Sequence, residues 1–294
     1  MKKSWYIIFA ICFCLQSKAQ HNSDYIQYMF NGLLLNPAYA GSREALDITG
    51  LYRNQWMGIV GSPVTSSFGA HTPLKNKHFN IGMTVVNDKF GLFNQTTANL
   101  IYAYRMRFLK GNLSFGVQGG VNYITSNWSK INTIQKDDPN FSSTSNDAKI
   151  TPEAGFGTYY YSKNFYVGLS APNVFNETLS KYRTVIGNTG ILVNISEDFK
   201  IKPAILVKYI YSSPLSTNLS STFYWKDFIG LGLGYTLNTS AMAFIDLKLN
   251  EQLRFGYGYD YALNRLNIYT SGSHEIMLRY LFKYKINPLS VRYF

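Results

Sequence analysis

The residue types that most often do chemistry are sparse in this chain of 294 residues, and their spacing matches no catalytic or metal-binding motif. No two histidines stand at a spacing typical of zinc ligands. No serine lies in the Gly-x-Ser-x-Gly elbow that exposes a hydrolase nucleophile. The four histidines are His21, His71, His78 and His274, and the two cysteines are Cys12 and Cys14.

Three local groups have some resemblance to a site. Gly230-x-Gly232-x-Gly234 resembles a phosphate loop, but its strict period of two places it in the wall of a strand. Asp137-Asp138 could bind a cation, although a solvated turn is the simpler interpretation, and His274-Glu275 is expected to be an ordinary interfacial pair. We therefore predict no catalytic, cofactor-binding or metal-binding residues and no enzymatic activity. A membrane-embedded lipase or protease would need a nucleophile with a base in reach.

The first residues of the chain have the features of an export signal, so the folded part is expected to begin after them. Lys2 and Lys3 precede an apolar run from Trp5 to Leu15, and Ser17-Lys18-Ala19 forms a small-x-small cleavage site. The run is shorter than the roughly 20 residues of a spanning helix. We predict a cleaved signal peptide over residues 1–19, with a retained anchor as the alternative. Both cysteines lie inside it, so the mature chain has no thiol and no disulfide.

From Glu44 onward the sequence consists of short segments in which large apolar residues alternate with small or polar ones. One clear segment alternates Ile229, Leu231, Leu233, Tyr235 and Leu237 with Gly230, Gly232, Gly234 and Thr236. Alternation fits a soluble sandwich as well as a membrane barrel. Export, the glycine-rich polar face, and an apolar face of Tyr, Phe and Leu favour the barrel, which shows its apolar face to lipid.

The predicted fold is therefore all-β: a transmembrane antiparallel up-and-down barrel of about 14 strands over residues 44–284. The content of 24 Tyr and 20 Phe fits aromatic girdles at two membrane interfaces. The formal charge of +12 falls to about +9 without Lys2, Lys3 and Lys18. For an exported chain this charge favours outer-membrane lipid or an acidic partner and excludes nucleic acid as the expected ligand.

Connection lengths alternate along the predicted barrel. Turns such as Leu109–Gly111 are tight, whereas Ile131–Thr151, Asn173–Thr184 and Ala262–Ser273 are long. Outer-membrane barrels have short periplasmic turns and long outer loops. The pattern predicts an integral protein of the cell outer membrane in which both chain ends are periplasmic. Residues 285–294 then form a C-terminal periplasmic tail.

Residues 20–43 are apolar but lack the period of a strand. Pro37 is excluded from a central strand, and Gly41 permits a sharp turn. We predict that this segment is a plug in the lumen or across its periplasmic mouth, packed against the glycine-rich wall; a flexible periplasmic tail is the alternative. The predicted plug residues are Tyr28, Phe30, Asn31, Leu35, Asn36, Pro37, Tyr39 and Gly41.

The same segment carries a resemblance to a known family. The matching runs are Tyr25–Asn31, Leu35–Arg43, Tyr52–Trp56, Ser67–Leu74, His274–Ile276 and Arg292–Phe294. They resemble the PorP/SprF family, membrane proteins of the type IX secretion system and gliding apparatus of Bacteroidetes, over essentially the whole mature chain. One departure is Gly32, where the family's Phe-Asn-Pro leads us to expect proline. This difference predicts a slightly looser plug.

The resemblance implies a function rather than an activity. It implies an outer-membrane protein that serves as the export or surface-attachment partner of a large secreted adhesin with a type B C-terminal domain. Other type IX secretion components would be further partners. The alternative function is a passive porin-like outer-membrane channel. Neither function requires a cofactor.

Overall fold

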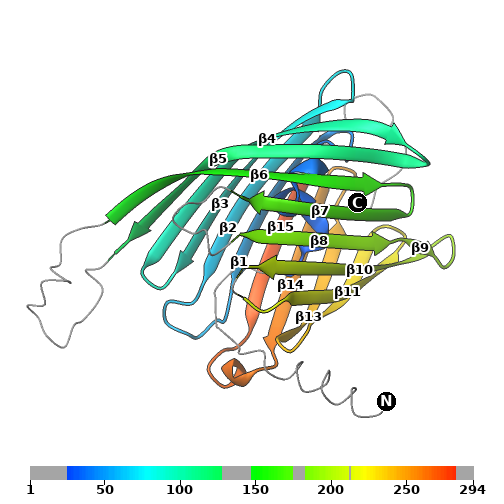
Figure 1. The fold of residues 1–294 in the computed structure, drawn as a ribbon. Coiled ribbons are helices and arrows are strands. Elements are labelled where there is room, and N and C mark those ends of the chain that lie inside the picture. Colours follow the sequence, from blue (N-terminus) through cyan, green and yellow to red (C-terminus); the bar gives the residue numbers. More distant parts are fainter. Residues whose placement is uncertain (1–24, 128–146, 175–182, 212, 283–294) are drawn as a thin grey trace, which may run out of the picture.

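The described residues form one closed antiparallel sheet in the computed structural model, which describes residues 25–127, 147–174, 183–211 and 213–282 (Figure 1). The predicted signal peptide, the C-terminal tail and Asp137-Asp138 lie outside the described residues. The strands are β1 (Leu46–Asn54), β2 (Val64–Pro73), β3 (Phe79–Phe90), β4 (Phe93–Phe108), β5 (Gly111–Ser126), β6 (Asp147–Tyr161), β7 (Phe165–Asn173), β8 (Thr184–Ile191), β9 (Val193–Asn194), β10 (Phe199–Ile210), β11 (Ser216–Trp225), β12 (Ile229–Thr236), β13 (Ser240–Lys248), β14 (Leu253–Ala262) and β15 (Ser273–Phe282).

The sheet closes because its first and last strands pair. β1 and β15 are antiparallel from Leu46 opposite Phe282 to Asn54 opposite His274. β8 and β9 both pair with β10 and act as one wall position, interrupted at Leu192. The interruption faces the part of β10 that contains Pro203, which has no backbone N–H to donate. The barrel therefore has 14 strand positions, as the alternation predicted.

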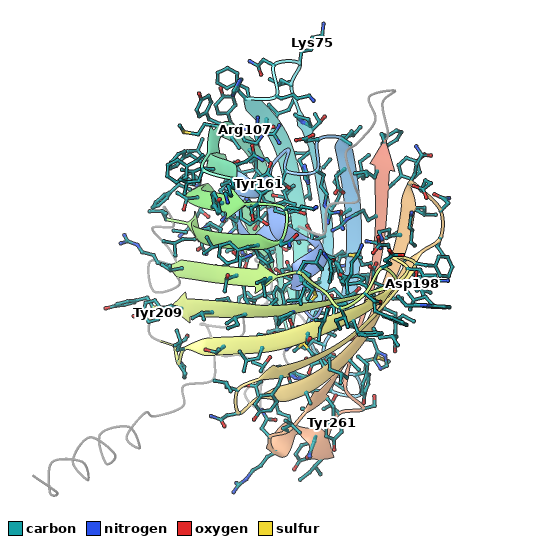
Figure 2. All side chains as sticks on the ribbon, turned by 90° about the vertical axis from the view of Figure 1, so that its right-hand side faces the viewer. Lys75, Arg107, Tyr161, Asp198, Tyr209 and Tyr261 are labelled. Carbon is teal, nitrogen blue, oxygen red and sulfur yellow. The ribbon has the colours of Figure 1, made fainter. Side chains whose placement is uncertain are left out.

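Alternate side chains of each strand lie on opposite faces of the wall. On β12, Leu231 and Leu233 are 55% and 71% exposed on the outside, whereas Gly230 and Gly232 are buried. Tyr209 likewise lies outside, and Tyr161 is buried inside (Figure 2). A membrane barrel has this inside-out arrangement, with its apolar face toward lipid.

The two ends of the barrel differ in their connections. We call the end with residues 74–78, 109–110, 162–164, 195–198, 226–228 and 249–252 the short-turn end, and the opposite one the long-loop end. The long-loop end carries residues 55–63 and 263–272, and two connections that lie partly outside the described residues, 127–146 and 174–183. The shorter connections 91–92, 211–215 and 237–239 are at the same end. There β6 extends beyond its partner β7: the Ala154 carbonyl still accepts from the Val174 N–H at 2.7 Å, whereas residues 147–153 pair only with β5 among the described residues (Figure 1).

Residues 25–43 lie within the barrel, where Figure 1 shows them in dark blue. They form three short helices: η1 (Tyr28–Phe30), α2 (Gly32–Leu35) and η2 (Pro37–Tyr39). No helix of the described residues is long and apolar enough to cross a membrane.

A charge on the outer face tests the lipid-facing assignment. Leu233→Arg at the centre of β12 should lower the free energy of unfolding by about 2–4 kcal/mol, because an arginine at the bilayer midplane must leave water. Leu109→Arg, in a short turn where Leu109 is 81% exposed, should cost at most about 1 kcal/mol. Urea titration in lipid vesicles measures both. Equal costs would contradict a membrane-embedded outer face.

Candidate functional site

The segment inside the barrel starts at the long-loop end, where a carboxylate holds its backbone. Glu275, near the start of β15, accepts hydrogen bonds from the backbone N–H groups of Ile26 (2.8 Å) and Gln27 (2.7 Å). Arg53 lies opposite Glu275 on β1, and their charged groups are 3.5 Å apart. Arg53 also donates to Asp260 at 3.0 Å. The segment is therefore tied to the β1–β15 seam, and both charges of the seam are buried.

From there the segment descends past the middle of the strands. The Tyr28 hydroxyl is hydrogen-bonded to the Ser220 hydroxyl of β11 at 2.9 Å. Phe30 packs edge-on against Phe244 of β13, with ring centroids 6.0 Å apart. Leu33 lies against Gly69 of β2. β11 and β2 are six positions apart in the 14-position wall, so these contacts place this part of the segment across the lumen.

The next stretch packs directly against glycines of the wall. The Asn36 amide donates to the carbonyl of Thr158 at 2.8 Å, and its oxygen accepts from the Ala38 N–H at 2.9 Å. A side chain on Gly116 would overlap the backbone of Pro37 and Ala38, and one on Gly157 would overlap Asn36. The glycines of β5 and β6 thus make room for the segment.

At the short-turn end the segment turns into β1. The Gly41 N–H donates to His71 Nδ1 at 3.0 Å, and its carbonyl accepts from Arg105 at 3.1 Å. Gly41 has φ +72°, a conformation that glycine adopts without the Cβ penalty of other residues. The Tyr39 ring packs edge-on against His71, with ring centroids 5.5 Å apart.

A buried ionic cluster surrounds this turn. Asp47 of β1 lies 3.7 Å from Arg43 and 3.6 Å from Arg279 of β15. Its oxygen also accepts from Thr49 at 3.1 Å. Removing one member of such a cluster would leave the others charged and unpaired in a site closed to water, so these groups fix the segment where it enters the wall.

All eight predicted plug residues are buried in the lumen. Sequence reasoning missed Gln27 and Glu275, and Glu275 is not the interfacial residue that was expected. His274 and Glu275 point to opposite faces: His274 Nδ1 is 2.7 Å from the Tyr257 hydroxyl outside, while Glu275 is fully buried inside. The alternation itself could have revealed this, because Glu275 shares its face with Met277 and Arg279.

One further expectation is corrected. Gly32 does not leave the segment loose, because the Tyr39 ring occupies the space that a side chain at Gly32 would fill. The predicted periplasmic position of the two chain ends stays a prediction, because both ends lie outside the described residues. Among the described residues, Tyr25 lies at the long-loop end and Phe282 at the short-turn end, because the segment runs the length of the lumen before β1 begins.

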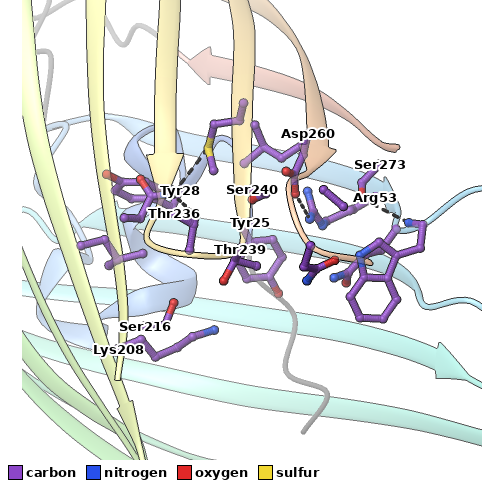
Figure 3. A pocket seen from close by; sticks show the side chains of 18 of the residues that line it. Tyr25, Tyr28, Arg53, Lys208, Ser216, Thr236, Thr239, Ser240, Asp260 and Ser273 are labelled. Atoms are coloured by element: carbon purple, nitrogen blue, oxygen red, sulfur yellow. Dashed lines mark hydrogen bonds and ion pairs between the residues drawn. The ribbon is translucent and has the colours of Figure 1, made fainter. Parts of the chain in front are cut away.

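Above the segment, a recess of about 50 Å³ lies at the long-loop mouth (Figure 3). Tyr25, Ile26 and Tyr28 form part of its lining. β15 contributes the Ser273 hydroxyl and the connection between β12 and β13 contributes that of Thr239. Arg53, Lys208 and Asp260 add charges. This volume holds a few water molecules or one inserted side chain. Among the described residues, no group of three His, Cys, Asp or Glu side chains could hold a metal ion.

The contact between segment and wall can be tested with one methyl group. Gly116→Ala should lower the free energy of unfolding by about 1–3 kcal/mol, because the new Cβ forces Pro37 and Ala38 out of place. Gly119→Ala, on the same strand, meets nothing within 4 Å and is the matched control. Urea unfolding in vesicles compares them. Equal stabilities would show that the segment does not rest on β5.

A closed 14-position barrel with an apolar exterior and an occupied lumen defines an integral outer-membrane β-barrel protein. The chain belongs to the family described as type IX secretion system membrane protein PorP/SprF, whose pattern matches residues 17–280. No curated protein matches the sequence.

Solved structures that are similar to this chain include the following two. The Acinetobacter baumannii outer membrane protein Omp33 is 9% identical, with a TM-score of 0.50 over 81% of this chain and 98% of that one. A mutant of the TodX monoaromatic hydrocarbon channel is 9% identical, with a TM-score of 0.48 over 85% of this chain and 92% of the channel. At this identity the likeness to Omp33 shows a barrel fold and nothing of its ligand.

Proposed function

We propose that the protein is a non-enzymatic export or surface-attachment partner for a secreted adhesin with a type B C-terminal domain. The observation that carries the proposal is the occupied lumen. Tyr28, Phe30 and Ala38 are each at most 2% exposed at successive depths of the barrel. A barrel that its own segment fills is better suited to holding a partner at its mouth than to passing solutes. Membership of a type IX secretion family supports a partner that is handled by this secretion system.

We further propose that the long-loop end faces outward and that Phe282 lies on the periplasmic side, which is the usual orientation of short turns. A partner would then contact the long-loop end, where the recess opens and β6 extends beyond β7. Other secretion components would be reached from the periplasmic side.

Binding of a defined probe tests the proposal. Purified type B C-terminal domains from adhesins of the same organism, each fused to a fluorescent protein, are mixed with the detergent-solubilised barrel. Thr239→Arg places a long cation over the recess from an exposed turn and should abolish binding. Asn76→Arg, in an exposed turn at the short-turn end, is the control and should bind normally. Binding by neither the wild type nor the control would refute the adhesin role.

A further inference from the structure

The cations of the short-turn end are unevenly distributed around the barrel. Three of its turns join β2 to β3, β4 to β5 and β6 to β7, and residues 74–78, 107–110 and 162–164 contain no Asp or Glu. The exposed cations in these residues are Lys75, Lys77, Arg107, Lys110 and Lys163. Because β2 to β7 are neighbours in the sheet, the three turns form one continuous stretch, which we call the basic rim.

The charge of the basic rim is not compensated within the part of the chain that the structure describes. None of the five cations forms an ion pair with another described residue. Lys75 projects from the tip of its turn, away from the wall (Figure 2). Ion pairs neutralise the opposite side of the short-turn end: Lys200 with Asp227 at 2.8 Å, Lys226 with Asp198 at 3.8 Å, and Lys248 with Glu251 at 2.7 Å.

Apolar side chains lie among these cations and next to them on the outer face. Leu74 and Leu109 are 41% and 81% exposed within the turns. An aromatic layer follows on the same strands: the ring centroid of Tyr160 on β6 is 6.4 Å from that of Phe108 on β4 and 6.5 Å from that of Phe165 on β7. Such a layer marks the membrane interface of a barrel. The cations of the basic rim therefore lie at the level of the lipid headgroups.

Positive charge at this level attracts anionic lipid. One Lys or Arg near an anionic membrane surface strengthens binding about fivefold. An acidic protein would match the sign of the charge but not the residue types, because protein interfaces are depleted in lysine and four of the five cations are lysines. The exposed Leu74 and Leu109 side chains can enter the interface, while the long lysine side chains reach the phosphates.

We propose that the basic rim binds the phosphate groups of anionic phospholipids and concentrates these lipids beside β2 to β7. The opposite side of the short-turn end, where ion pairs neutralise the cations, has no such preference. The proposal does not depend on the adhesin role or on the orientation proposed above, because it concerns only the leaflet that surrounds the short-turn end. With that orientation, the lipids belong to the periplasmic leaflet.

Quenching of a fluorophore by spin-labelled lipid measures the lipid composition beside one turn. Bimane is attached at Leu109→Cys in the basic rim or at Phe228→Cys in the turn between β11 and β12, both exposed positions. The only native cysteines, Cys12 and Cys14, lie in the predicted signal peptide. The barrel is placed in phosphatidylcholine vesicles that contain equal small shares of nitroxide-labelled phosphatidylglycerol or, separately, nitroxide-labelled phosphatidylcholine.

We expect phosphatidylglycerol to be enriched about fivefold over phosphatidylcholine at Leu109→Cys and not at all at Phe228→Cys. The enrichment should disappear at about 1 M salt, where the screening length is about 3 Å. Equal quenching by the two lipids at Leu109→Cys would overturn the proposal and leave the basic rim to an acidic protein. Equal enrichment at both positions would overturn it too, because the preference would then not be confined to the basic rim.

Two variants with the same loss of charge separate the basic rim from net charge. The rim variant combines Lys75→Gln, Lys77→Gln, Lys110→Gln and Lys163→Gln, and the control variant combines Lys89→Gln, Lys149→Gln, Arg183→Gln and Arg265→Gln at exposed positions of the long-loop end. The rim variant should lower the enrichment at Leu109→Cys to at most about twofold, and the control variant should leave it unchanged. Heat-modifiable migration in gels confirms that both fold. An equal loss in the two variants would assign the preference to net charge and overturn the proposal.

Discussion

Deleting residues 25–41 should turn a non-conducting barrel into a stepwise conducting pore in planar lipid bilayers. The deletion removes the side chains that fill the lumen from Glu275 down to His71. The remaining wall is glycine-rich and polar, so water and ions would enter. Larger barrels without a plug leave such an aqueous channel. The intact protein should show no steady current.

The control is a deletion of residues 265–269, the exposed long-loop segment that contains η6 (Arg265–Ile268), which contributes nothing to the lumen. Heat-modifiable migration in gels shows which variants fold. If the large deletion prevents folding, Gly116→Ala displaces the segment without removing it and should produce brief, flickering openings. Steady conductance of the intact protein would refute the closed lumen and favour the porin alternative.

Glu275→Ala should lower the free energy of unfolding by about 3–5 kcal/mol, the cost of breaking a buried ion pair from one side. It leaves the N–H groups of Ile26 and Gln27 without an acceptor and removes one of the two carboxylates that face Arg53. Glu275→Gln keeps the shape and one acceptor oxygen, so it should cost about 1–3 kcal/mol. Tryptophan fluorescence during urea unfolding in vesicles measures both.

Glu251→Ala is the matched control. Glu251 pairs with Lys248 at 2.7 Å, but its side chain is 67% exposed, so its loss should cost at most about 1 kcal/mol. If Glu275→Ala unfolds at the same urea concentration as this control, the carboxylate does not hold the segment.

The barrel could be predicted from the sequence because large apolar residues alternate with small or polar ones in each strand of its wall. Ile229 to Leu237 alternate large and small residues, and β12 shows the same alternation in space. The absence of that alternation in residues 20–43 indicated a segment that is not wall. What the alternation cannot encode is depth. Nothing in the sequence says whether Tyr28 or Tyr39 lies nearer the mouth, because depth depends on the strands that each one meets.

The Glu275 contact was missed for a related reason. Its partners Ile26 and Gln27 are 249 and 248 positions away, and a backbone N–H leaves no mark in a sequence. Gly32 was misjudged because its role depends on the Tyr39 ring, which folds back over it only when α2 and η2 pack together.

The Glu275 carboxylate bridges the N-terminal segment and the two strands that complete the cylinder. Glu275 belongs to β15, and its carboxylate accepts from the Ile26 N–H. Its contact with Arg53 of β1 forms only when β15 pairs with β1. Once the sheet is closed, its hydrogen-bonded wall has no opening through which a segment with side chains as large as Phe30 could pass between strands. The segment must therefore either be in place before β15 pairs with β1 or enter the closed barrel lengthwise through one of its two ends. After β15 has paired with β1, the segment can leave the lumen only through an end of the barrel.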